Sequence, residues 1–487
     1  MLNNYIVSLI IYLCSSMFSL KFTQNRKVYI YLIFTVPFLS FLLIDHPTIL
    51  EPYIYGKILN IQNPDLFNND YYLQSTNISG PYNNFCFMFT HIPMKLIPSF
   101  FYGIWLSIIY YYLLWIYKYI KFYFNFNNKL YLPISIIVLT LHLATIKSYS
   151  WGGFLVGDNE FIYSMLKPQS LSIILCLWSL LFLNEKKYFI SFLLVGIGGL
   201  FHINTLQHFL IIHFIYIFAN HSFHRNYKTI SLCFFSITPL FFLSAYPFIK
   251  AELFNLNLSN YIDISCFFRH PHHFIVSGWN KIEFIIFIFF ILAAIYCNRF
   301  NIIKDNLFKV LLILTIVLFI ISYFSIEIFK VDLVAKFQFY RFPIYLKPFI
   351  LIFVTVGIVR YFNYKNISFI LLSIFILLIP LARGKLGSVD LNLPSNPRYL
   401  SINKTTDIDT IFIIPPLMNH NEITDFLLNA RRSIYFDFSR YPFNKGSETI
   451  WISKIYEPPF EKLPVLEHER CIKEFYELNK RWNAIKE

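Results

Sequence analysis

Apolar residues gather into twelve stretches along this chain of 487 residues, and short polar or charged segments separate them. Each stretch is close to the ~17–25 residues that a helix needs to cross a bilayer. The pattern therefore predicts an α-helical polytopic membrane protein with about 12 transmembrane helices. The expected spans are residues 5–20, 28–44, 98–117, 130–146, 168–184, 188–203, 204–219, 229–248, 282–297, 310–326, 346–361 and 366–382.

Lysine and arginine mark every second connection between these stretches, and the positive-inside rule makes those connections cytoplasmic. The basic connections contain Lys21, Arg26 and Lys27; Lys118, Lys121 and Lys129; Lys186 and Lys187; Arg225 and Lys228; Arg299, Lys304 and Lys309; and Arg360 and Lys365. The remaining connections then face outward: 45–97, 147–167, 249–281, 327–345 and everything after 383. We expect a bacterial plasma-membrane protein whose termini and active face are periplasmic or extracellular. One continuous helix through His202–Thr205 would change the count.

Two domains are expected from the fall in hydropathy after Arg383. Residues 1–383 form the transmembrane domain, and residues 384–487 form a small outward-facing α/β domain. Its expected elements are a strand at Thr410–Ile414, a helix at Glu422–Ala430, a strand at Ser433–Phe438 and a helical end from about Leu466 to Lys486.

Composition narrows the class of protein further. Hydrophobic residues make up 56% of the chain and charged residues 14%, which excludes a globular soluble core. The net charge of +14 is dispersed over short turns, so nucleic acid is not an expected partner, whereas membrane lipids are. None of the seven cysteines forms a CxxC motif, and the sequence leaves open whether a disulfide joins Cys86 to Cys266 on the outward side.

Carboxylates supply the first candidate chemistry. Asp45 and His46 follow an apolar span directly, and Asp70 lies in the same outward loop. A carboxylate at a helix end beside the membrane is well placed to act as a base on a substrate that approaches from the lipid. The simpler alternative is that Asp45 only ends the span and is solvated by headgroups.

A second outward loop contains Gly157-Asp158-Asn159-Glu160. Asp158 and Glu160 are candidates to ligate Mg²⁺ or Mn²⁺, or to hydrogen-bond sugar hydroxyls. An acidic loop tip is also often just solvated, so the pair gains weight only from lying on the same face as Asp45 and Asp70.

Cations and imidazoles in the later outward loops favour binding of a phosphate or pyrophosphate, since arginine offers a bidentate fork and histidine donates a hydrogen bond or a proton. Zinc is less expected there, because no carboxylate or cysteine stands at helical spacing from the histidines. The candidate residues are Arg269, His270, His272, His273, Lys336, Arg341 and His202. Arg341 also fits an interfacial anchor, and His208 and His213 fit polar residues packed between helices.

These features together resemble the GT-C superfamily of polytopic glycosyltransferases, which use polyprenyl-phosphate-linked sugars on the outer face. The matching features are Asp45 at the end of an early span, acidic residues in the first two large outward loops (Asp70, Asp158 and Glu160), alternating basic turns and an outward C-terminal domain. The Arg-His-Pro-His-His run, the Gly-Leu-Phe-His span end and the Arg-Arg-Ser-Ile-Tyr-Phe-Asp-Phe segment are also similar to a poorly characterised bacterial membrane family near that superfamily. The first loop has no DxD motif and the C-terminal region no WWD motif.

The resemblance implies an inverting membrane glycosyltransferase of polysaccharide biosynthesis in the cell envelope, acting on a glycan, lipid or protein acceptor. Asp45 would be the general base, and Arg269, His272, His273 or Arg341 would neutralise the departing phosphate. An O-antigen polymerase or ligase has similar outward Arg and His residues. A polysaccharide or lipid transporter is disfavoured, because the spans contain few ionisable groups.

Overall fold

The computed structural model is mostly helical, and its helices follow the apolar stretches of the sequence. The structure describes residues 2–17, 26–43, 52–70, 73, 80–126, 130–146, 166–220, 222–254, 262, 266, 274–279, 281–361, 391, 393–412, 414 and 420–434. Helices coincide with eleven of the twelve predicted spans: α1 (Leu2–Met17), α2 (Arg26–Leu43), α6 (Ile97–Tyr123), α7 (Tyr131–Ile146), α8 (Pro168–Asn184), α9 (Tyr188–Gly199), α10 (Ile203–Ala219), α11 (Ser222–Phe254), α13 (Lys281–Lys304), α14 (Asn306–Ser322) and α16 (Pro343–Tyr361). The twelfth span, 366–382, lies outside the described residues.

Membrane character is evident from the length and composition of these helices. Four segments of the described chain are long and apolar enough to cross a membrane: Met94–Tyr123, Tyr227–Tyr246, Asn306–Ile328 and Asp332–Tyr361. Six further apolar helices are 10–17 residues long. The chain is therefore a membrane protein with at least four candidate spans.

The junction between α9 and α10 is a break between two helices. Phe201 and His202 donate backbone hydrogen bonds to the carbonyl of Gly198 (3.0 and 3.1 Å), which closes the end of α9. A Cβ atom on Gly199 would lie 2.8 Å from a methyl group of Leu206, so a larger residue would have to displace that side chain where the two helices meet. The expectation of two separate helices at this point is confirmed.

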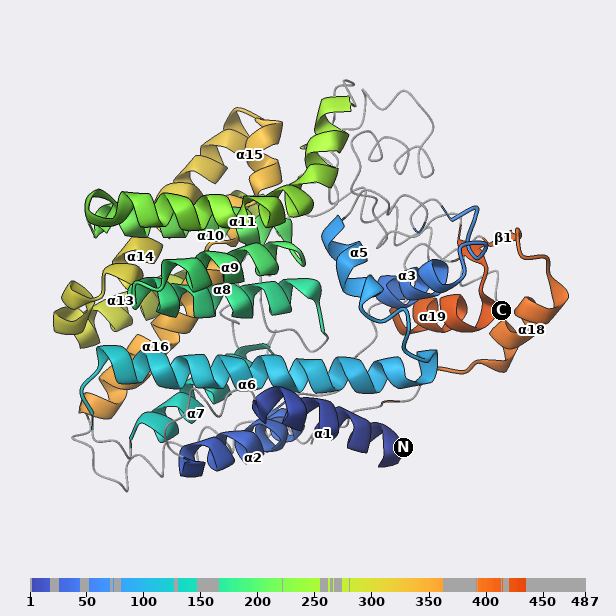
Figure 1. The fold of residues 1–487 in the computed structure, drawn as a ribbon, viewed down its shortest axis with the longest axis horizontal. Coiled ribbons are helices and arrows are strands. Elements are labelled where there is room, and N and C mark those ends of the chain that lie inside the picture. Colours follow the sequence, from blue (N-terminus) through green and yellow to red (C-terminus); the bar gives the residue numbers. More distant parts are fainter. Residues whose placement is uncertain are drawn as a thin grey trace.

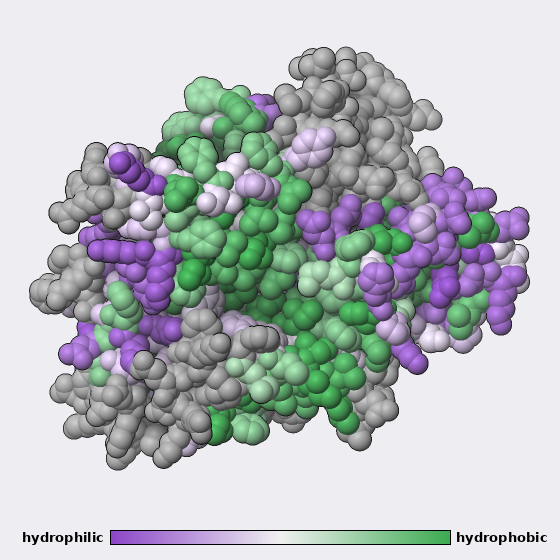
Figure 2. Space-filling view, in the orientation of Figure 1, coloured by the Kyte–Doolittle hydropathy of each residue, from purple (hydrophilic) through white to green (hydrophobic). Residues whose placement is uncertain are grey.

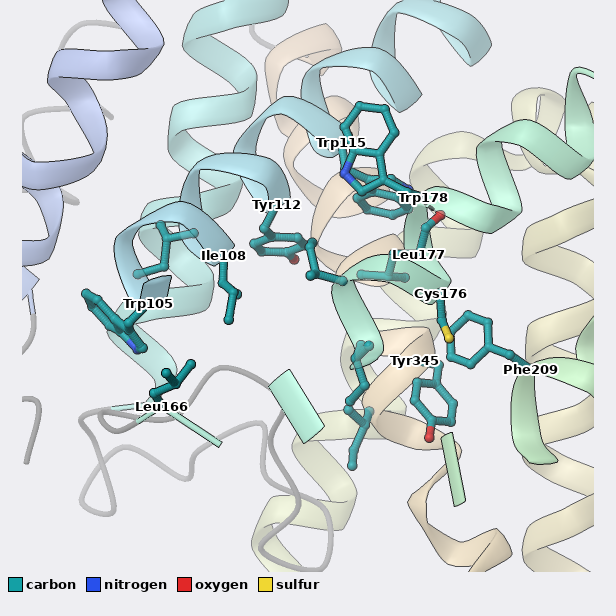
Figure 3. Packing of buried hydrophobic residues seen from close by; sticks show 14 of the residues in the cluster. Trp105, Ile108, Tyr112, Trp115, Leu166, Cys176, Leu177, Trp178, Phe209 and Tyr345 are labelled. Atoms are coloured by element: carbon teal, nitrogen blue, oxygen red, sulfur yellow. Dashed lines mark hydrogen bonds between the residues drawn. The ribbon is translucent and has the colours of Figure 1, made fainter. Parts of the chain in front are cut away.

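Helix α6 is the centre of the bundle, because its aromatic side chains pack against the helices on both sides. Of the most apolar 18 residues of Met94–Tyr123, 83% are buried, against 22% for Tyr227–Tyr246. Trp115 donates a hydrogen bond to the carbonyl of Leu177 (2.8 Å; Figure 3). The Tyr112 hydroxyl lies 2.9 Å from Nδ1 of His142. These bonds satisfy polar atoms inside an apolar core and fix α6 against α7 and α8.

Large apolar side chains are exposed on the outer helices, as expected for a surface that faces lipid. A green band crosses the middle of the molecule in Figure 2, and purple residues gather at the right-hand end. The most exposed side chains include Phe34 and Phe38 of α2, Leu232, Phe235 and Phe242 of α11, Ile285, Phe289 and Tyr296 of α13, and Ile313 of α14.

Connections predicted to be cytoplasmic meet one another at one end of the bundle. Tyr119 at the end of α6 donates a short hydrogen bond to Asp305 before α14. The Tyr216 hydroxyl donates to Asn184 (2.6 Å), and the Arg360 guanidinium lies over the Phe126 ring (5.2 Å). With the hydrogen bond from Asn306 to Asn220, these contacts place the described residues of five of the six expected inner turns at one end of the bundle. Lys21, in the first expected inner turn, lies outside the described residues.

Connections predicted to be outward also meet. Asn84 in α5 (Gly80–Phe87) donates to the carbonyl of Leu200 (3.0 Å), and the Ser277 amide donates to Glu327 (3.2 Å). The Phe274 and Tyr340 rings are 4.6 Å apart. This end carries α3 (Pro52–Gln62) and the short helix η3 (Met94–Leu96) from the first loop, η7 (Val276–Gly278), the π-helical turn η8 (Tyr323–Ile328), α15 (Asp332–Phe337) and η9 (Phe339–Arg341).

The described C-terminal residues pack on the first outward loop, where α18, α19 and α3 lie together in Figure 1. Their elements are α18 (Pro397–Thr405), β1 (Ile411–Phe412), α19 (His420–Asp425), the π-helical turn η10 (Phe426–Ala430) and β2 (Ser433–Ile434). The strands are parallel, with Ile411 opposite Ser433. The expected strand–helix–strand order is present, although each strand is described over two residues only. The predicted helix at Leu466–Lys486 lies outside the described residues.

Candidate phosphate-binding site

Four of the sequence-predicted site residues lie in the described part of the chain: Asp70, His202, Lys336 and Arg341. The other eight lie outside it, and their convergence on one site stays a prediction. They are Asp45, His46, Asp158, Glu160, Arg269, His270, His272 and His273.

His202 is the N-cap of α10, and its hydrogen bonds define its tautomer. The backbone N–H of Thr205 donates to Nδ1 of His202 (3.3 Å), and the Thr205 hydroxyl lies 2.9 Å from the same atom. An Nδ1 atom that accepts carries no proton, so the neutral ring holds its proton on Nε2. Burial lowers the pKa of His202 well below its usual value of 6.5, and the positive charge of Arg341 lowers it further. His202 is therefore a neutral N–H donor close to a guanidinium.

His208 fastens α10 to the segment that carries Arg341. Its Nε2 donates to the carbonyl of Phe337 (2.7 Å), and its Nδ1 accepts from the Tyr345 hydroxyl (2.8 Å). The ring is fully buried and packs 4.9 Å from the Phe342 ring. The expectation that His208 is a polar residue packed between helices is confirmed, and the contacts add that it positions the outward segment α15–η9.

The segment α15–η9 turns sharply before Arg341. Gln338 adopts a left-handed conformation (φ 53°) between α15 and η9, and the Arg341 amide donates to its carbonyl (3.0 Å). The turn places Lys336 and Arg341, both half-buried, on either side of Gln338 in the chain. The guanidinium of Arg341 and the neutral N–H donor of His202 suit an anion with several oxygens, such as a phosphate, and Lys336 adds a second cation to the same segment.

Asp70 has a structural role that the sequence does not show. Its carboxylate is buried, with Oδ1 accepting from the Leu73 amide (3.0 Å) and Oδ2 from the Ile434 amide (3.1 Å). Asn69 beside it donates to the carbonyl of Asp409 (2.9 Å). Asp70 therefore joins the first outward loop to β2, and both of its oxygens have hydrogen-bond donors.

Lys57 of α3 is buried, which the sequence pattern does not predict. Lys57 donates from Nζ to the carbonyl of Leu73 (3.1 Å), on the same turn that Asp70 holds. Burial lowers its pKa to about 8. Most lysines in proteins are exposed, so the sequence gives no sign that Lys57 is buried; its contact with Leu73 in the fold shows it.

Asp305 is a second residue that the sequence analysis did not single out, at the opposite end of the bundle. Its Oδ1 accepts from the amides of Leu307 and Phe308 (3.0 and 3.1 Å), which caps α14, while Tyr119 donates to Oδ2. Burial raises its pKa to about 6. An Asp immediately before an apolar stretch is a recognisable N-cap signal, but its burial depends on α6.

A metal site is not found in the described residues, which contain no group of three His, Cys, Asp or Glu side chains placed to hold an ion. The candidate ligands Asp158 and Glu160 lie outside these residues, so Mg²⁺ or Mn²⁺ binding stays a prediction. Cys86 and Cys266 are both buried. Comparison of the chain with protein-family models, with curated proteins and with solved structures gives no match.

Proposed function

We propose that this protein is an inverting membrane glycosyltransferase with twelve spans in a bacterial plasma membrane, acting on the extracytoplasmic face. It transfers a sugar from a polyprenyl-phosphate donor to a glycan, lipid or protein acceptor. The observation that supports this most is that Arg341 lies near enough to the neutral N–H donor of His202 for its charge to lower the His202 pKa, at the end of the bundle expected to face outward. A polyprenyl chain stays in the bilayer, so its phosphate has to be bound at such an end.

The reaction follows from the groups assigned above. An acceptor hydroxyl attacks the anomeric carbon, a new glycosidic C–O bond forms and the C–O bond to the phosphate breaks. Asp45 takes the hydroxyl proton, and the polyprenyl phosphate leaves with the electron pair of the broken bond. Arg341 and His202, with Arg269 and His272 from the third outward loop, stabilise the negative charge on the leaving group, and a well-placed donor of this kind is worth ~3–4 kcal/mol.

Binding of a short polyprenyl phosphate tests the site directly. We expect the purified protein in nanodiscs to bind farnesyl phosphate, and Arg341→Ala to lose at least about tenfold in affinity, because a charged hydrogen bond contributes about 1.5–3 kcal/mol. Arg360→Ala is the matched control, since Arg360 lies at the opposite end over Phe124 and Phe126. Equal losses in the two variants, or none in Arg341→Ala, would contradict the proposed site.

The runner-up, an O-antigen polymerase or ligase, would bind the same phosphate but transfer a preassembled glycan. Products that grow by one sugar per turnover support the proposed function, whereas products that grow by whole oligosaccharide units support the runner-up.

A further inference from the structure

Gln338 has a buried carboxamide oxygen that no group in the described part of the chain satisfies. Its Oε1 is shielded from solvent and makes no hydrogen bond within the described part of the chain. Buried polar atoms in folded proteins almost always have a partner, and leaving one unpaired lowers stability. An acceptor in this state is ready for a ligand that carries a hydrogen-bond donor.

The backbone conformation of Gln338 is a second, independent unusual feature. Its φ of 53° lies in the left-handed region, which is strained for a residue other than glycine. Glycine would make this turn without strain. The position instead holds a glutamine, whose backbone is strained and whose side-chain oxygen has no partner among the described residues. Strained residues of this kind concentrate at ligand-binding sites.

The surroundings of Gln338 hold it beside the cations of the candidate site. The carbonyl of the preceding residue, Phe337, is held by His208 (2.7 Å), and the carbonyl of Gln338 itself accepts from the Arg341 amide (3.0 Å). The position of the Gln338 backbone relative to Arg341 is therefore set by the fold before any ligand binds.

We propose that Oε1 of Gln338 accepts a hydrogen bond from a hydroxyl of the sugar whose phosphate Arg341 and His202 bind, so that Gln338 recognises the donor sugar. This inference rests on the proposed function. A polyprenyl tail has no hydrogen-bond donor, and an ionised phosphodiester has only acceptors. The sugar is the one part of the donor that can satisfy a carboxamide oxygen.

The test compares two probes and three variants. Farnesyl phosphate reports the phosphate site alone, and farnesyl-phosphoryl sugars (glucose, galactose, mannose and N-acetylglucosamine) report the sugar as well. We expect the wild-type protein to bind one of these sugar probes about three- to tenfold more tightly than farnesyl phosphate. Gln338→Gly should lose this preference while its affinity for farnesyl phosphate and its thermal midpoint stay equal or rise, since glycine relieves the strain.

Two further variants separate recognition from backbone strain. Lys330→Gly is the matched control, because Lys330 has a similar φ of 50° in the same outward segment and should keep the sugar preference. Asparagine tolerates the left-handed region, but its side chain is one methylene shorter and withdraws the carboxamide. Gln338→Asn should therefore lose the sugar preference, as Gln338→Gly does.

Each result decides the question. A sugar preference that survives in Gln338→Gly overturns the inference, and so does a wild-type protein that binds every probe equally well. Failure of the wild-type protein to bind farnesyl phosphate at all overturns the proposed function first and the role of Gln338 with it.

Discussion

Nε2 of His208 donates a hydrogen bond to the carbonyl oxygen of Phe337 over 2.7 Å, although 129 residues separate the two in the chain. The bond joins the first half of α10 to the turn that carries Arg341. His208 is thus expected to act on phosphate binding through the position of Arg341 and not by touching the ligand.

Replacement of His208 tests this positioning role. His208→Ala removes the hydrogen bonds of His208 to the Phe337 carbonyl and to the Tyr345 hydroxyl, at a cost of about 1–3 kcal/mol for a buried group that loses its partner. We expect a lower thermal midpoint in detergent and weaker binding of farnesyl phosphate. Tyr345→Phe is the control, since it removes only the hydroxyl and leaves the bond to Phe337 in place, and it should change binding less. Wild-type affinity in His208→Ala would show that Arg341 does not depend on this bond.

Asp305 predicts a pH dependence of stability. Its pKa is about 6 in the folded protein against 3.8 for an aspartate fully exposed to water, so the folded state binds the proton more tightly than the unfolded state. The stability that protonation confers is fully present below pH 3.8 and is lost as the pH rises through 6, at a cost on the order of 3 kcal/mol.

Asp305→Asn should remove that dependence, because asparagine keeps the N-cap without the buried charge. We expect the thermal midpoint of the variant to exceed that of the wild type most clearly at pH 8, and the difference to shrink toward pH 4. Asp407→Asn, at an exposed position, is the control. A constant difference at every pH would mean that Asp305 does not titrate in this range.

Replacement of Asp70 tests whether its carboxylate holds the first outward loop against β2. Asp70→Asn keeps one acceptor but turns an NH₂ group toward a backbone N–H, so the contact with Leu73 or Ile434 is lost. We expect destabilisation of about 1–3 kcal/mol and faster tryptic cleavage at Arg431 and Arg432. Asp65→Asn, in the same loop but exposed, should behave as the wild type. Unchanged cleavage in Asp70→Asn would argue that the α3–α19 packing alone holds this region.

The orientation in the membrane is testable by labelling single cysteines in a background without the native ones. A membrane-impermeant maleimide should label Asp409→Cys in intact cells, because Asp409 accepts a hydrogen bond from Asn69 of the first outward loop. Lys186→Cys should be labelled only after permeabilisation, as a basic inner turn requires. The reverse pattern would put Arg341 on the cytoplasmic side and remove the basis of the proposed function.

The predicted base gives a kinetic prediction. Asp45→Asn keeps size and hydrogen bonding but removes the carboxylate, so turnover should fall by about 10²–10⁴-fold while protein level and donor binding are retained. Arg341→Ala should instead weaken donor binding. Near-normal turnover in Asp45→Asn would direct the search for the base to Asp158 or Glu160, since the oxygens of Asp70 already accept backbone hydrogen bonds.

The sequence by itself determined the helices and their alternation across the bundle. Apolar stretches of helical length and basic turns are local properties, so they can be read without knowing which segments meet. The segments around α6 and α16 accordingly emerged as helices close to their expected bounds. Local signals, a cation and an imidazole beside expected outer span ends, also predict Arg341 and His202 as candidate phosphate ligands.

Only the tertiary structure decided what the polar side chains contact, because their partners are remote in the chain. Asp70 reads as a catalytic carboxylate in its loop, yet Ile434, 364 residues away, donates to it. The sequence predicts His208 as a packed polar residue, and only the fold shows that it binds the Phe337 carbonyl. Asp305 likewise has the pattern of an ordinary N-cap, and only the fold shows that Tyr119 covers it. Hydrophobic burial is non-directional and leaves its pattern in composition, whereas a hydrogen bond needs two specific atoms within about 3 Å, and only packing brings them together.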